Sequence, residues 1–323
     1  MKKQSIIVQI VRKRIFMMIM IFVIMLAVFS IMTKGAMLNP RNLLNILSAM
    51  AVSAFLTTGI SMLMISGRLD LSTGANGTLC GMLIAYLLRG GMAFLPALIV
   101  SLALGAIVGL ANAALVNELN MAPFIATLAT SSVATGLVYL IANKKTIDIF
   151  DPVMQNYGSY MLFNYIPVSI LFAFAFMIII GVILHKTTFG RQIYLVGGNA
   201  QASMLSGINP KKMSYILFMV CGVFSSAAGI TLTARTHTAT IQGLVLQRFQ
   251  GITAAVLGGI SFGGGAGGMA GAFVGLLVLN TFSNGLVVIG MSPYLQNVAT
   301  GLLLIVALAL DFFQQKQSQK VVV

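Results

Sequence analysis

Two pairs of polar side chains stand at helical spacing inside apolar stretches. Thr127 and Ser131 are four residues apart, as are Asn280 and Asn284, so each pair shares one face of a helix. Such groups either join neighbouring helices by hydrogen bonds or line a path for a neutral, hydroxyl-rich solute that must be held loosely enough to leave. The candidates for such a path are Asp70, Ser72, Thr127, Ser131, Asn280, Asn284 and Asn297.

The residue types that carry catalysis are scarce. His185 and His237 are the two histidines, and neither has a nucleophile or carboxylate at motif spacing. Cys80 and Cys221 lie far apart within apolar runs, which favours buried packing over a disulfide or a metal site. We therefore expect no catalytic residue, no metal and no cofactor bound by this chain.

Glycine is concentrated between Gly258 and Gly268, in GGISFGGGAGG. A regular helix cannot run through this segment, because each Gly costs about 1 kcal/mol relative to Ala. A phosphate-binding P-loop needs a Lys after its last Gly, and none follows here. The chain therefore lacks a Walker A motif and cannot be an ATPase by itself. Two small-xxx-small pairs, Gly105 with Gly109 and Gly271 with Gly275, predict close helix packing.

Composition determines the class of protein. Apolar residues make up 59% of the 323 residues, charged residues 7%, and the mean hydropathy is +1.00. These values exclude a soluble globule and predict an all-α, polytopic membrane protein in a lipid bilayer. The net charge of +14 would suggest nucleic acid in a soluble chain. Here the basic residues flank apolar runs, so we expect orientation in the membrane and no nucleic-acid binding.

The apolar runs predict about ten transmembrane helices in a membrane domain over residues 15–312. The first run shows no convincing cleavage site, so we expect an uncleaved first span. The eighth is short, and a broken or re-entrant helix is an alternative there. The expected spans are 15–32, 43–65, 73–88, 94–116, 123–142, 166–184, 213–234, 249–260, 269–289 and 294–310.

The distribution of basic residues orients these spans. Of the 19 Lys and Arg residues, about twelve fall in segments that lie inside if the N-terminus is cytoplasmic, and about seven fall outside. We expect a basic cytoplasmic N-terminus (1–14), a cytoplasmic loop (185–212) and a cytoplasmic C-terminal tail (313–323). Near the outer face, Arg235, His237 and Arg248 are candidates for docking an acidic partner surface.

The loop between the sixth and seventh spans has the pattern of a short capped helix. Gly197 and Gly198 are expected to break the chain before it, Asn199 to cap its N-terminus and Gly207 to end it. A short rigid helix between two flexible breaks can pass a rigid-body push from a soluble partner to the membrane spans.

From about Leu43 to Asp311 the chain resembles the permease subunits of bacterial ABC importers for ribose, xylose and galactosides. Four segments in order carry the resemblance: SGRLDLSTG from Ser66, APFIATLATSSVATGL from Ala122, FGRQIYLVGGNAQASMLSGIN from Phe189, and AAVLGGISFGGGAGGMAGAFVGLLVLNTFSNGL from Ala254. The chain departs from the family pattern at Arg68, where a second Gly is usual, and at Ala200, Met204, Ala266 and Gly268, where charged residues are common.

The resemblance implies a permease subunit in the bacterial plasma (inner) membrane that pairs with a second permease copy, in a homodimer or a heterodimer. It implies two cytoplasmic ATPase subunits, which use ATP and Mg, and an extracytoplasmic sugar-binding protein that delivers the solute. The residues implied to couple the chain to the ATPase are Gly197, Gly198, Asn199, Ala202, Leu205, Ser206 and Gly207.

A stand-alone secondary transporter or channel is the alternative function. Ion-coupled transporters usually bury ionisable groups within their spans, whereas the five acidic residues here lie at or beyond the ends of the expected spans: Asp70, Glu118, Asp148, Asp151 and Asp311. The energy for transport is therefore expected to come from a separate subunit.

Overall fold

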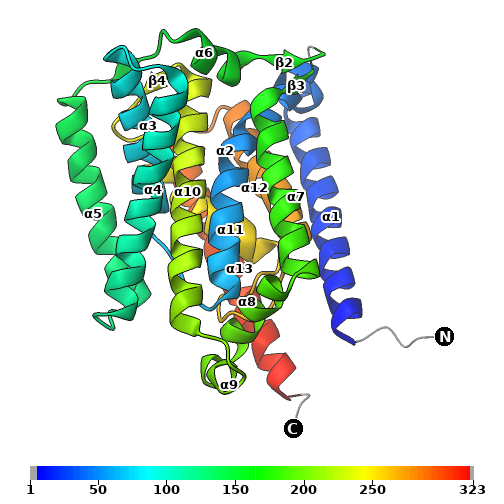
Figure 1. Cartoon of the computed structure of the whole chain (residues 1–323). Helices are drawn as coiled ribbons and strands as arrows, with labels where there is room; N and C mark the ends of the chain where they lie inside the picture. Colours follow the sequence, from blue (N-terminus) through cyan, green and yellow to red (C-terminus); the bar gives the residue numbers. More distant parts are fainter. Residues whose placement is uncertain (1–5, 164, 321–323) are drawn as a thin grey trace.

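The apolar stretches fold into long helices, which satisfy their backbone hydrogen bonds within one segment. The computed structural model, which describes residues 6–163 and 165–320, arranges them side by side in a bundle (Figure 1). Seven of the described helices are long and apolar enough to cross a membrane. They are α1 (Ile6–Met32), α2 (Pro40–Ile65), α4 (Phe94–Asn117), α5 (Pro123–Ala142), α7 (Val168–Lys186), α10 (Pro210–Thr236) and α12 (Met269–Val288).

Three further helices correspond to the remaining expected spans. α3 (Thr73–Arg89) has 17 residues, α11 (Gln250–Leu257) has eight, and α13 (Pro293–Lys320) has its apolar part between Pro293 and Ala309. The all-α class is confirmed, while the count of ten spans stays a prediction. Residues 1–5 and 321–323 of the two expected cytoplasmic tails lie outside the described residues.

Short elements lie at the two ends of the bundle (Figure 1). At one end, called here the hairpin end, are η1 (Ala36–Leu38), α6 (Pro152–Ser159) and two small antiparallel pairs. β1 (Ile147–Asp148) pairs with β4 (Thr238–Ala239), Ile147 opposite Ala239, and β2 (Met161–Leu162) pairs with β3 (Ile166–Pro167), Met161 opposite Pro167. At the other, the α9 end, are α8 (Thr188–Gly198), α9 (Ala200–Leu205), the start of α1 and the last turns of α13.

The core lies around α2 and α10. The most apolar stretch of α2 is 83% buried inside the protein, whereas that of α1 is only 6% buried. α2 is therefore central and α1 is peripheral. α4 packs closely on α10 because glycines lie at their contact. A methyl group at Gly105 would meet Gly222 of α10, and one at Gly109 would collide with the carbonyl of Phe218. The packing role predicted for these glycines is therefore confirmed.

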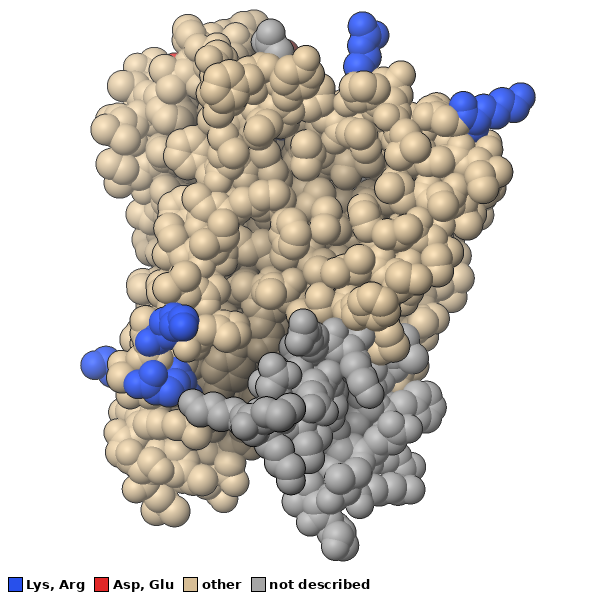
Figure 2. All heavy atoms as spheres, turned by 90° about the vertical axis from the view of Figure 1, so that its right-hand side faces the viewer, with Lys and Arg blue, Asp and Glu red and all other residues tan. Residues whose placement is uncertain are grey.

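The surface between the two ends is apolar. On the face shown in Figure 2, Lys and Arg side chains project only near the two ends, and a broad uncharged belt separates them. Exposed apolar side chains such as Phe16, Ile107 and Ile178 lie in the middle of α1, α4 and α7. An apolar exterior is suited to hydrocarbon and unsuited to water. The chain is thus a multi-pass membrane protein.

The eighth expected span is only partly helical. After β4 the chain turns inward through η2 (Val245–Gln247) before α11 begins. Leu244 is fully buried there, and its N–H donates to Thr78 Oγ1 of α3 at 2.9 Å. Non-helical backbone at membrane depth is tolerated when it is buried in protein, so this segment matches the broken-helix alternative.

Candidate solute cavity and coupling segment

A polar cavity of about 480 Å³ lies between α2, α10, α11, α12 and α13. Its lining comes from the half of α2 nearest the hairpin end and from the last turns of α10 and α12. Aliphatic side chains contribute, but carboxamides dominate its polar surface. These are Asn42, Asn45, Gln247, Gln250, Asn280, Asn284 and Gln296.

Hydrogen bonds join the carboxamides across the cavity. Asn42 and Asn284 donate to each other's Oδ1 at 2.9 and 3.0 Å. Deeper along α2, Ser53 Oγ lies 3.3 Å from both Gln250 Oε1 and Asn280 Oδ1. Each carboxamide offers two donors and an acceptor oxygen, so these bonds leave capacity for a hydroxyl-bearing solute. The lining is suited to exchanging hydrogen bonds with such a molecule.

The cavity contains some of the predicted path residues and not others. Asn280 and Asn284 both line it, on the shared face of α12 that their spacing predicts. Asn297 does not line it, although the adjacent Gln296 does. Asp70, Ser72, Thr127 and Ser131 lie elsewhere. The structure thus brings together two of the seven predicted residues in this cavity.

Asp70, Ser72 and Thr127 form a separate buried network with α4. Asp70 is only 1% exposed, which was not expected for a residue beyond a span end. Its carboxylate accepts from Ser72 N–H at 2.7 Å, from Ser72 Oγ at 2.6 Å and from Asn112 Nδ2 at 3.3 Å. Thr127 Oγ1 accepts from Leu71 N–H at 3.1 Å. The network fixes the chain between α2 and α3, and Ser131 is buried about one turn beyond Thr127 on α5.

Sequence reasoning missed most of the cavity. Asn42, Asn45 and Ser53 lie on one face of α2, and Gln247 precedes Gln250 by three residues. This helical spacing is a usable signal. Amides near the end of a span are ordinary at a membrane interface, so the spacing alone does not distinguish a cavity lining.

The three predicted docking residues occupy different surroundings. Arg235 lines the cavity. His237 ends α10 with a φ of 54°, and its Nε2 lies 2.7 Å from Ser159 Oγ of α6. Arg248 lies deeper than the outer face expected for it, because its Cβ packs where a methyl group on Gly74 of α3 would lie. Its guanidinium carbon is 5.6 Å from the Phe249 ring centroid.

The expected short helix is present as α9. Asn199 Oδ1 accepts from Ala202 N–H at 3.0 Å, so the predicted N-cap is confirmed. Gly207 has a φ of 79°, and the N–H of Ile208 reaches the Ser203 carbonyl at 3.0 Å. This is a Schellman ending, with Gly207 just beyond the cap. Leu205 is 92% exposed at the α9 end, where a partner could contact it.

The prediction that Gly197 and Gly198 break the chain before this helix is wrong. Both residues end α8 as regular helix. The reason is packing: a methyl group on Gly197 would collide with the Ile65 carbonyl of α2. The same carbonyl accepts from Gly265 N–H at 2.8 Å, and Tyr194 of α8 donates to the Gly267 carbonyl at 2.8 Å. α8 therefore connects the end of α2 with the loop before α12.

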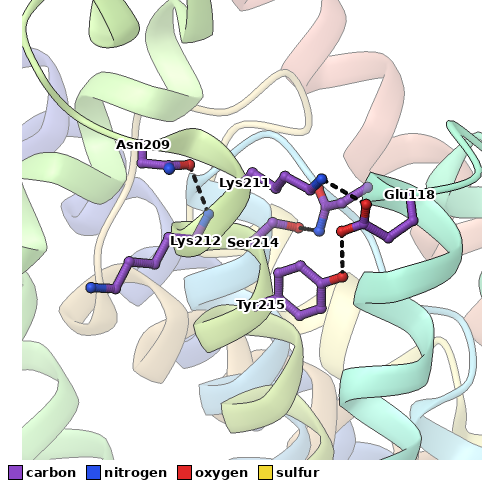
Figure 3. Close-up of polar contacts among 7 residues, drawn as sticks. Glu118, Asn209, Lys211, Lys212, Ser214 and Tyr215 are labelled. Carbon is purple, nitrogen blue, oxygen red and sulfur yellow. Dashed lines mark hydrogen bonds and ion pairs between the residues drawn. The ribbon is translucent and has the colours of Figure 1, made fainter.

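The far end of the coupling segment is attached to α4 (Figure 3). Lys211 Nζ and Tyr215 Oη donate to the two carboxylate oxygens of Glu118 at 2.7 and 2.8 Å. These bonds, with the charge of Lys211, lower the pKa of Glu118. Asn209 Oδ1 accepts from Lys212 N–H at 3.0 Å and caps α10. The segment from α8 to α10 is thus held at both ends.

Comparison with known proteins places the chain among transport permeases. Residues 42–308 match a family described as branched-chain amino acid transport system / permease component. The chain is 34% identical to the ribose import permease protein of Bacillus subtilis, covering 85% of both chains. It is 32% identical to the galactose/methyl galactoside import permease protein of Escherichia coli, covering 90% of this chain and 93% of that protein. It is 31% identical to the D-allose transport system permease protein of Escherichia coli, covering 90% and 89%.

No solved structure matches the chain. The family match nevertheless covers most of the sequence and includes the cavity, the buried network of Asp70 and the coupling segment. The four segments that suggested the resemblance all begin and end within it. The chain therefore belongs to this family of transport-system permease components.

Proposed function

We propose that this chain is the membrane-spanning permease subunit of an ABC importer. It moves a monosaccharide or sugar-like solute into the cytoplasm, and a separate subunit supplies the energy. The observation that most directly supports this proposal is the carboxamide-lined cavity, which lies within the residues that match the permease family. The names of the ribose, galactose and allose permeases support a sugar as the solute.

The proposed topology has ten crossings with both ends in the cytoplasm of a bacterium, in its plasma (inner) membrane. The arrangement of the helices supports it, because α1 begins and α13 ends at the α9 end of the bundle. α3 and α11 are too short to cross alone. Chain outside the α-helices completes each crossing: residues 66–72 before α3 and the buried segment that contains η2 before α11.

The proposed partners bind at opposite ends. A cytoplasmic ATPase, which uses ATP and Mg, docks on the coupling segment, and the exposed Leu205 and capped α9 suit that contact. A sugar-binding protein docks at the hairpin end, and a second permease copy completes the membrane unit. The charge of Arg235 and Arg248, and the position of His237 at the end of α10, support these three residues for the binding-protein contact. Replacing both arginines with Glu should then weaken docking, and an unchanged affinity would contradict this assignment.

The stand-alone secondary transporter is not favoured. Ion coupling would place a titratable acid where solute and ion meet. Among the described residues that line the cavity none is acidic. The buried acid, Asp70, is outside the cavity and is already engaged by Ser72 and Asn112.

The test of this function is co-purification from the native host in mild detergent, followed by mass spectrometry of every associated polypeptide. We expect a near-stoichiometric protein carrying a Walker A sequence. It should be lost when residues 198–207 are scrambled and kept when the exposed turn around Gly91, at the hairpin end, is scrambled instead. If the chain purifies alone yet supports solute uptake in liposomes under an ion gradient, the importer proposal is wrong.

A further inference from the structure

Two polar groups that line the cavity lack partners. Ser283 Oγ is buried without a hydrogen bond. In the described part of the chain, the Arg235 guanidinium also makes no hydrogen bond or ion pair. Buried polar groups are normally satisfied, so the unpartnered Ser283 Oγ calls for an explanation. The Arg235 side chain is partly exposed, and its positive charge has no partner among the described residues. A bound solute that is hydrogen-bonded by both groups provides one.

Arg235 gives the cavity a positive charge that the described lining does not neutralise. The other polar residues of the lining are uncharged amides and hydroxyls, with no Asp or Glu among those described. A cation in the last turn of α10 complements the helix dipole, which explains a basic residue on this turn. It does not explain why the side chain lies at the cavity, where it is partly buried and no acidic residue of the described lining neutralises it.

A second cation lies close by along the chain. Arg248 separates Gln247 from Phe249 and Gln250, and both glutamines line the cavity. Its guanidinium lies over the Phe249 ring, and it forms no ion pair among the described residues. The carboxylate of Asp70 accepts its bonds from Ser72 and Asn112, outside the lining. The cavity should therefore attract anions.

We propose that the solute carries an anionic group in addition to its hydroxyls. A carboxylate or phosphate oxygen pair binds the Arg235 guanidinium, because its fork of N–H donors matches that geometry. The hydroxyls of the same molecule bond to Ser283 and to the carboxamides. This inference rests on the proposed function, and it replaces the neutral solute expected from the sequence with an acidic or phosphorylated sugar.

The charge of the cavity can be measured independently of transport. A single cysteine replaces Asn45, an exposed lining residue, while Cys80 and Cys221 are buried and give little background. Intact cells are treated with an anionic or a cationic methanethiosulfonate of similar size. A cavity lined by charges of one sign raises the local concentration of ions of the opposite charge by about tenfold or more. We expect the anionic reagent to be favoured by about tenfold, and Arg235→Gln to remove most of the preference, with Arg248 accounting for what remains.

Two controls define the result. Ala93→Cys lies in the exposed turn before α4, so its reagent preference should not change with Arg235→Gln. Arg235→Lys keeps the charge and should keep most of the preference at position 45. An equal preference with and without Arg235 overturns the proposal. Failure of both reagents to label position 45 shows instead that the cavity is closed to the outside, which also contradicts its role in the proposed function.

The solute is then probed with matched pairs that differ in one anionic group. D-Galacturonate is compared with D-galactose, and D-ribose 5-phosphate with D-ribose, as protectants of Asn45→Cys against labelling. Protection by an anionic member in wild type, lost in Arg235→Gln, is the expected result, and it also identifies carboxylate or phosphate as the anion. Protection by the neutral members alone, or by none of the four, overturns the proposal.

Discussion

At the scale of single residues, glycine determines how closely the helices approach. Gly105 and Gly109 of α4 face Gly222 and Phe218 of α10, and Gly271 of α12 faces Gly258. Side chains at these positions would collide with backbone atoms, which cannot move aside as a flexible side chain can. Transmembrane helices associate through such close packing, because lipid provides no hydrophobic drive between them.

Gly109→Ala should therefore destabilise the protein. The added methyl group would meet the Phe218 carbonyl, and overpacking of this kind typically costs about 1–3 kcal/mol. Gly136→Ala in α5 is the matched control, since nothing lies within 4 Å of its added methyl group. That change should be neutral or stabilising by up to about 1 kcal/mol, from helix propensity. Thermal unfolding in detergent measures both, and equal Tm values for the two variants would contradict the packing argument.

Glu118 supplies a prediction about pH. Its pKa is lowered in the folded protein, first by the hydrogen bond from Lys211 and then by that from Tyr215. A lowered pKa adds stability above the unfolded value, and this stability is lost as the pH falls through the folded value. The Tm difference between wild type and Glu118→Gln should be small but constant near neutral pH. It should close below about pH 4, the ordinary range of Glu.

The control for this prediction is Asp151→Asn. Asp151 caps α6 through a bond from Met154 N–H, far along the chain from the contact of α4 with α10. Its difference from wild type should not depend on Lys211, whereas the effect of Glu118→Gln should shrink in a Lys211→Met background at neutral pH, where only the bond from Tyr215 remains. A Glu118→Gln difference that persists unchanged at acid pH would contradict the pKa assignment.

The sequence predicted poorly which single residues line the cavity. The Asn280 and Asn284 pair was found, because a spacing of four within an apolar run is unambiguous. Asp70 was predicted to be near a solute, yet it lies in a buried network with Ser72 and Asn112. Spacing specifies which face of a helix a residue occupies. It cannot specify which neighbour that face meets, since tertiary packing decides it.

At the scale of elements, α8 connects the coupling segment with the cavity helices. Its last turn contacts the end of α2, and Tyr194 holds the loop that leads into α12. Both α2 and α12 line the cavity. A push on α9 can therefore reach the cavity through packed and hydrogen-bonded elements, which is the kind of rigid-body linkage that switching requires.

Tyr194→Phe should uncouple this linkage in part. It removes one hydroxyl donor to the Gly267 carbonyl and leaves the ring in place, and a hydrogen bond is worth about 1 kcal/mol. We expect solute moved per ATP to fall about fivefold in proteoliposomes that contain the complete transporter, with ATP hydrolysis retained. Tyr160→Phe, at the exposed hairpin end, is the control. If the ratio is unchanged in Tyr194→Phe, the hydroxyl does not transmit the motion.

The element boundaries were largely predictable, because apolar runs and caps are local features. Asn199 was recognisable as a cap residue of the kind that helices prefer, and it caps α9. Asn209, which was not predicted, caps α10 in the same way. The break expected at Gly197 and Gly198 was wrong for a non-local reason. Glycine there serves the contact with Ile65, which is more than a hundred residues earlier in the chain.

At the scale of the whole molecule, α3 determines how often the chain crosses the membrane. Seven described helices are long and apolar enough to cross, and α3 is shorter than these seven. Its 17 residues span about 26 Å, less than the roughly 30 Å hydrocarbon core. The preceding chain, whose Asp70 and Ser72 are buried by α4, supplies the remainder if α3 crosses.

Crossing by α3 predicts which side of the membrane each later loop occupies. With a cytoplasmic N-terminus, position 145 lies outside and position 202 inside if α3 crosses, and the two are exchanged if it does not. Lys145→Cys and Ala202→Cys are exposed positions in a chain whose own cysteines are buried. A membrane-impermeant maleimide should label position 145 in intact cells, and position 202 only after the membrane is opened. The reverse pattern would remove α3 from the spans and, with it, the assignment of α9 to the cytoplasmic ATPase.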